Sequence, residues 1–107
     1  MDLTLYSIQS LAAKRFPFNR EHYPDIPDDP GKANHYAQKH LLTHLSKNIG
    51  EIAAAIEPKD HGRHDTEVGA TIIRKLLVNT IRLADVSGVP LESIQASISN
   101  WAEGRER

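Results

Sequence analysis

Histidine and carboxylate side chains along residues 40–51 are the first candidates for chemistry in this chain. The 107 residues include six histidines, and His40 and His44 stand four positions apart. Side chains at this spacing share one face of a helix, and with a nearby carboxylate such as Glu51 they can hold Zn²⁺ or another transition metal. Glu51 lies about two helical turns beyond His44, so one ion cannot contact all three side chains. A solvated helix face is the alternative interpretation.

A second cluster of metal-ligand residue types, with a polar turn as its alternative interpretation, comprises His61, His64, Asp60 and Asp65. Other chemistries lack the residues they need. The chain has no cysteine, which excludes disulfides, thiolate metal sites and cysteine nucleophiles. The serines have no matched base and acid, and no glycine-rich segment has the pattern of a phosphate-binding loop.

Composition and charge predict a single globular domain over residues 1–107. Hydrophobic residues make up 39% and charged residues 25% of the chain, which is typical of a folded protein. The 13 basic and 14 acidic residues give a net charge of −1, and this balance argues against nucleic acid or an anionic membrane as a partner. No apolar run approaches the ~20 residues that cross a bilayer. The expected location is cytoplasmic.

Apolar residues recur at spacings of three and four, which predicts four helices and an all-α fold. The expected helices cover about residues 3–15, 32–57, 65 or 66 to 87, and 90–101. Asp2 and Asp65 are the expected N-caps of the first and third helices. Gly88 fits the left-handed position beyond the third helix, and Pro90 fits a position near the first turn of the fourth.

The connection between the first two helices is unusually long and rich in proline. Residues 16–31 contain four prolines, which exclude a regular helix or a central strand. Loops of this length are usually functional or flexible. Aromatic residues in and beside it indicate that part of the loop packs down, with stacking on a nucleotide base as the alternative; they are Phe16, Phe18, Tyr23 and Tyr36.

The other end of the chain carries an apolar stripe and a charged tail. Trp101 continues the stripe of the fourth helix, and we expect it in the core or at a subunit interface. Residues 103–107 are mostly charged and are expected to fray.

Two segments resemble the MazG-like nucleotide pyrophosphohydrolases. Residues 82–92, RLADVSGVPLE, are similar to the end of that family's third helix, and residues 49–53, IGEIA, are similar to its metal-binding helix. The resemblance implies a four-helix bundle with two long central helices, completed by assembly into a homodimer or tetramer. It also implies hydrolysis of a nucleoside triphosphate to the monophosphate and pyrophosphate. The family's Mg²⁺ is held by acids in an ExxE pattern on one helix and an ExxD pattern on the next.

Most of the acids that this resemblance calls for are replaced. The first motif falls on Asn48 and Glu51, and the second falls on Ile72 and Lys75. Only Glu51 is a carboxylate, so the resemblance assigns the catalytic and Mg²⁺-binding roles to Glu51 alone. Neutral Asn48 and cationic Lys47 and Lys75 do not concentrate the negative charge that Mg²⁺ needs. We therefore expect Mg²⁺-dependent hydrolysis to be lost or strongly weakened.

The replacements leave amide and ammonium groups as candidate ligand contacts, namely Lys47, Asn48, Lys75 and Asn79. Lysine can hold a phosphate as a point charge, although a solvated surface position is the alternative for Lys75. The sequence thus predicts a scaffold kept for oligomerisation and for binding a nucleotide or a protein. The alternative function is an active nucleoside triphosphate pyrophosphohydrolase with Mg²⁺ at an atypical site centred on Glu51.

Overall fold

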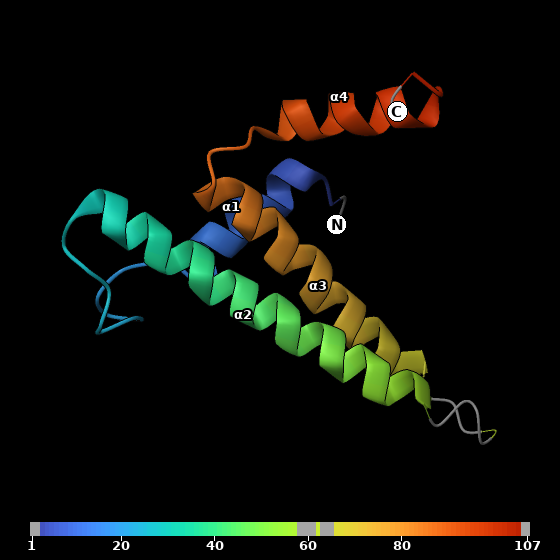
Figure 1. Cartoon of the computed structure of the whole chain (residues 1–107), viewed down its shortest axis with the longest axis horizontal. Helices are drawn as coiled ribbons and strands as arrows, with labels where there is room; N and C mark the ends of the chain where they lie inside the picture. The colour runs from blue at the N-terminus through green and yellow to red at the C-terminus, as the bar shows by residue number, and fades with distance from the viewer. Residues whose placement is uncertain (1–2, 58–61, 63–65, 106–107) are drawn as a thin grey trace.

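The fold is known from a computed structural model, which describes residues 3–57, 62 and 66–105. These residues form four helices, α1 (Leu5–Arg15), α2 (Pro30–Ile56), α3 (Thr66–Val86) and α4 (Leu91–Ala102) (Figure 1). Because the described ranges contain no strand, the predicted all-α class is confirmed. None of these helices is both long enough and apolar enough to span a bilayer.

Helix α1 begins with a reciprocal pair of caps. The Thr4 hydroxyl accepts from the backbone N–H of Ser7 at 3.1 Å, and the Ser7 hydroxyl accepts from the backbone N–H of Thr4 at 2.8 Å. This capping box satisfies N–H groups that the first helical turn leaves unpaired. The prediction of Asp2 as the N-cap is therefore wrong, because Thr4 holds that position.

Helix α2 has 27 residues and also has a side-chain cap. Asp29 is the N-cap, and its Oδ2 accepts from the backbone N–H of Lys32 at 2.9 Å. Pro30 occupies the first helical position, where its missing N–H costs least. These two residues start the helix earlier than the predicted Lys32.

Helix α3 runs antiparallel to α2 and packs along it, while α1 packs on α3 (Figure 1). Beyond α3, Gly88 has a φ of 68°, which confirms the predicted left-handed position. Asp65, the predicted cap of this helix, lies outside the described residues.

Helix α4 starts at Leu91 with Pro90 as its N-cap, so Pro90 lies next to the first turn. Leu91 is buried, and the Tyr6 hydroxyl donates to Oε1 of Glu92 at 2.6 Å. These contacts hold the first turn of α4 near α1. The rest of α4 extends away from the α2–α3 hairpin (Figure 1), and Trp101 is 71% exposed rather than in the core.

The apolar core is small for a chain of this length. Among the described residues, the buried apolar side chains are Ala12, Ile26, Ala37, Leu41, Ile72, Ile81 and Leu91. Leu41 is fully enclosed between the helices. Ile26 belongs to the proline-rich loop, so part of that loop packs down as predicted. A core this small leaves a single copy of the chain with limited stabilisation from burial.

Candidate functional site

A network of hydrogen-bonded polar side chains crosses the interface between α2 and α3. Asn48 is only 3% exposed. Its Nδ2 donates to Oε1 of Glu51 at 3.0 Å, and its Oδ1 accepts from Nδ2 of Asn79 at 3.0 Å. Nζ of Lys75 lies 3.5 Å from Oε2 of Glu51. The structure therefore brings together four of the five predicted residues of this site.

Antiparallel packing explains why these four residues meet. The step from Asn48 to Glu51 along α2 runs in the same direction as the step back from Asn79 to Lys75 along α3. Residues three or four apart are neighbours on a helix surface, so each helix presents two polar side chains to the other. Lys47, the fifth predicted residue, is exposed.

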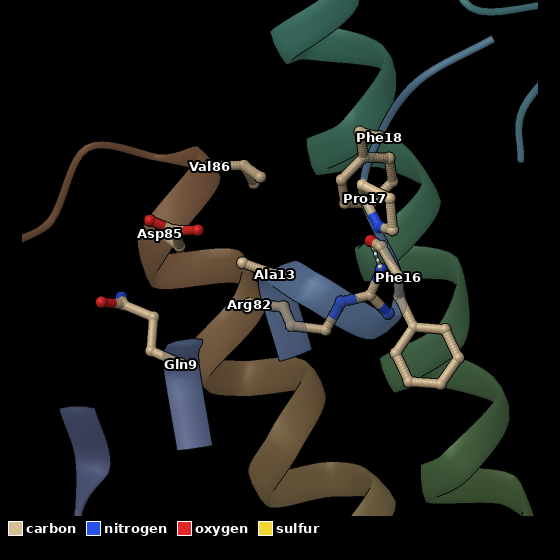
Figure 2. A pocket seen from close by; sticks show the side chains of 8 residues that line it. All are labelled: Gln9, Ala13, Phe16, Pro17, Phe18, Arg82, Asp85 and Val86. Carbon is tan, nitrogen blue, oxygen red and sulfur yellow. Dashed lines mark hydrogen bonds between the residues drawn. The ribbon is translucent and has the colours of Figure 1, made fainter. Parts of the chain in front are cut away.

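Arg82 extends this network from α3 to the proline-rich loop. Its Nη1 donates to Oδ1 of Asn79 at 3.3 Å, and its Nη2 donates to the carbonyl oxygen of Phe16 at 3.2 Å. The guanidinium carbon lies 5.3 Å from the ring centroid of Phe16 and 5.1 Å from that of Phe18, within the range of cation–π attraction. Figure 2 shows Arg82 reaching from α3 toward these loop residues. Arg82 therefore connects the loop to the polar network by hydrogen bonds to both.

The surroundings of Glu51 favour its ionised form. The hydrogen bond from Asn48 is the largest influence and lowers the pKa of the Glu51 carboxyl below its ordinary value. Partial burial acts in the opposite direction, and the positive charges of Lys75 and Lys47 lower the pKa further. Ionised Glu51 is thus neutralised by the cationic side chain of Lys75.

The remaining motif position, Ile72, belongs to the apolar core. Its side chain is 5% exposed, and a carboxylate at that depth needs a partner or a metal to offset its loss of hydration. Of the four positions matched to metal-binding acids, Glu51 alone carries a carboxylate.

His40 and His44 form a second cluster on α2, about three and two turns before Glu51. Their Nε2 atoms are 3.0 Å apart, and the His40 ring packs edge-on against Tyr23 with centroids 4.8 Å apart. Burial is the main cause that lowers the pKa of His40, followed by the charges of His44 and Arg82. The part of the chain that the structure describes contains no group of three or more metal-ligand residues. The predicted cluster around His61 and His64 lies outside that part.

Two hollows lie beside these clusters. One cavity of about 90 Å³ is lined by Gln9, Ala13, Phe16, Pro17, Phe18, Arg82, Asp85 and Val86 (Figure 2). It is much smaller than the ~300 Å³ at the lower end of small-molecule sites. A wider groove of about 640 Å³ is lined by Pro27, Asp29, Gly31, Lys32, His35, Tyr36, Lys39, His40 and Thr43. Neither is lined by Asn48, Glu51, Lys75 or Asn79.

The fold and the site define an all-α protein with an internally paired polar network between its two long helices. Comparisons of the chain with protein families, with curated proteins and with solved structures give no match.

Proposed function

We propose that this chain is a divergent MazG-like protein that has lost Mg²⁺-dependent nucleotide hydrolysis and acts as a homodimeric scaffold. The observation that carries this proposal is the position of Lys75, whose Nζ lies 3.5 Å from the Glu51 carboxylate. In the family that the sequence resembles, this position belongs to an acid that helps to hold a metal ion. An ammonium group there neutralises the remaining carboxylate and cannot activate water as a metal ion does.

The hydrogen-bonding state of the network also fits poorly with a bound Mg²⁺. Mg²⁺ requires near-octahedral oxygen ligands and is usually held by carboxylates. Here the Asn48 oxygen already accepts from Asn79 and one Glu51 oxygen already accepts from Asn48. Among the described residues, no buried side-chain nitrogen or oxygen lacks a partner. An ion would have to break these bonds and displace Lys75, so we assign it no role.

The scaffold part of the proposal rests on an exposed apolar face of the α2–α3 hairpin. This face comprises Leu42, Ile49 and Ile56 of α2 with Ile73 and Leu77 of α3, each 46% to 62% exposed. Ile49 and Leu77 stand two residues from Glu51 and Lys75 respectively, which is about 200° around each helix. Both apolar sets therefore lie on the side of the hairpin away from the Glu51–Lys75 pair.

A second copy of the chain is the partner that this face suits best. Leu42, Ile49 and Ile56 repeat every seven residues, which is the spacing by which two helices pack along each other. The stripe they form is about 21 Å long at 1.5 Å per residue. Monomeric proteins rarely leave contiguous apolar patches of this kind uncovered. Covering it would also compensate for the small core of one copy.

A pyrophosphate-release assay tests the loss of hydrolysis. The chain is incubated with common and modified nucleoside triphosphates in the presence of Mg²⁺ or Mn²⁺, and we expect no turnover above the protein-free background. Turnover that disappears in Glu51→Gln would contradict the proposal. It would support instead an active pyrophosphohydrolase whose site is centred on Glu51.

Sedimentation equilibrium tests the homodimer. We expect the wild-type chain to sediment as a dimer and Ile49→Glu to shift it to a monomer, because a charge would be buried in the apolar interface. Ala54→Glu is the matched control, since Ala54 is exposed on the same helix about 140° from Ile49. A wild-type monomer, or equal dissociation by both variants, would refute this interface.

A further inference from the structure

The Nε2 atoms of His40 and His44 face each other at hydrogen-bond distance. They are four residues apart on α2, their ring centroids are 4.5 Å apart, and their Nε2 atoms are separated by 3.0 Å. At this separation one Nε2–H donates to the lone pair of the other, since two protonated nitrogens would repel each other. When the donating ring shifts its proton from Nε2 to Nδ1, both rings stay neutral and both Nε2 lone pairs are free to bind a metal ion.

The separation of the two nitrogens favours one class of ion. With metal–nitrogen bonds of about 2.0–2.1 Å, two ligand atoms 3.0 Å apart subtend an angle of about 94° at the ion. An angle near 90° is that of adjacent ligands in square-planar or tetragonal Cu²⁺ and Ni²⁺ sites. Tetrahedral Zn²⁺ requires about 109°, which corresponds to nitrogens about 3.3 Å apart. Cu²⁺ and Ni²⁺, which bind imidazole in tetragonal geometry, therefore fit this separation.

Neighbouring residues hold His40 in place and leave it accessible. Phe18 and Tyr23 contact its ring edge-on, at centroid distances of 5.9 and 4.8 Å, and Tyr36 stacks on it at 6.3 Å. Residues that orient a metal-binding histidine strengthen its site. His40 also lines the open groove of about 640 Å³, which leaves room for water molecules as further ligands.

The charges around the pair act in two directions. The lowered pKa of His40, caused first by burial and then by His44 and Arg82, keeps its ring neutral near pH 7. A neutral ring is the form that binds a metal. Arg82, on the neighbouring helix, also opposes an added positive charge. We therefore expect a site of moderate affinity that depends on both histidines.

We propose that His40 and His44 form a two-histidine chelate for a divalent transition metal ion, Cu²⁺ or Ni²⁺, with water completing the coordination. This site lies apart from the Asn48–Glu51–Lys75–Asn79 network. It requires neither the loss of hydrolysis nor the dimer proposed above.

Titration of the full chain with CuSO₄ at about pH 7.5, followed by calorimetry and electron paramagnetic resonance, tests the chelate. We expect the strongest site to bind one Cu²⁺ per chain and to show coupling to two nitrogens. His40→Gln and His44→Gln should each weaken that site by roughly tenfold or more and remove one nitrogen coupling. His35→Gln, which alters the same groove on the same helix, should leave the site unchanged.

The histidines outside the described residues are tested by the double variant His61→Gln/His64→Gln. Retention of the strongest site in this variant supports the chelate on α2. Loss of the site in this variant, or wild-type Cu²⁺ affinity in His44→Gln, overturns it. Circular dichroism of each variant verifies that the helices are intact, and His44→Gln provides the test if His40→Gln does not fold.

Discussion

Asn79 donates from its Nδ2 to Oδ1 of Asn48 at 3.0 Å, and this bond joins α2 to α3 within their interface. Asn48 in turn donates to Glu51. Both the nitrogen and the oxygen of its amide are therefore hydrogen-bonded, and its side chain is almost fully buried. Two facing amides satisfy each other without an ion, whereas two facing carboxylates repel unless a cation or a proton lies between them. The amide pair thus joins the two helices without an ion between them.

Replacing Asn48 should destabilise the fold. Asn48→Ala leaves the Asn79 amide without its acceptor in the interface, and we expect the free energy of unfolding to fall by about 1–3 kcal/mol. Urea denaturation at a fixed protein concentration measures the loss. Asn34→Ala, at an exposed position of the same helix, should change the stability by less than about 0.5 kcal/mol. Equal effects of the two changes would refute the role of the buried amide.

Arg82→Lys should loosen the proline-rich loop. Arginine donates here to Asn79 and to the Phe16 carbonyl while facing two aromatic rings. The compact ammonium group of lysine cannot make both hydrogen bonds in the same planar geometry. We expect a loss of about 1–3 kcal/mol and faster tryptic cleavage at Arg20 in the loop. Arg74→Lys is the control, because Arg74 is exposed on α3. Unchanged cleavage in Arg82→Lys would show that this contact does not hold the loop.

Glu51 should link stability to pH on the acid side. Its folded-state pKa lies below the ordinary value of 4.5, mainly because Asn48 donates to it. The unfolded chain therefore takes up a proton at higher pH than the folded chain does. The stability that Glu51 contributes is complete above the unfolded pKa and is lost as the pH falls through the lower folded pKa.

Unfolding free energies measured across this acid range test the linkage. Glu51→Gln should flatten the decline in stability below pH 4.5, whereas Glu57→Gln, exposed at the end of the same helix, should preserve it. A decline that is equally steep in Glu51→Gln would assign the acid sensitivity to other carboxyl groups.

Rebuilding part of the acid cluster should create a cation site. The combination Asn48→Glu with Lys75→Asp places three carboxylates around the Glu51 position. We expect lower stability without a divalent ion, because like charges repel, and a rise in Tm on adding Mg²⁺ or Mn²⁺, because the ion binds the folded state. Thermal unfolding with and without the ion measures both effects.

The control for this variant matches its charge change at exposed positions of α2. Asn34→Glu with Lys39→Asp makes the same substitutions in solvent and should show no ion-dependent rise in Tm. A rise in Tm of the same size in the control would mean that the ion stabilises any variant with this added negative charge, whether or not the cluster is rebuilt.

The sequence predicted the helices well because their apolar spacing is a local property. It predicted helix starts less well, since a cap depends on which side chain reaches a free N–H. Thr4 caps α1 because the Ser7 hydroxyl also accepts a hydrogen bond from the Thr4 backbone N–H. Asp29 caps α2 because Pro30 follows it. The spacing of Asn48 and Glu51 placed both on one face, and the structure brings Lys75 and Asn79 to that face.

Arg82 was not predicted as a site residue because its partners are distant in sequence. It contacts Phe16 and Tyr23 of the loop, 66 and 59 positions away, and periodicity along one helix carries no information about such contacts. The same limit applies to His40 and His44. Their spacing predicts a shared face, whereas the facing Nε2 atoms depend on the rings of Phe18, Tyr23 and Tyr36 that surround His40.

The exposure of Trp101 has a practical consequence. It is the chain's one tryptophan, and 71% of it is open to solvent on α4, so its fluorescence should resemble that of indole in water. Covering α4 would shift the emission to shorter wavelength, while melting of the α2–α3 hairpin alone would leave the spectrum nearly unchanged. The fluorescence of Trp101 therefore distinguishes the binding of a partner to α4 from unfolding of the α2–α3 hairpin.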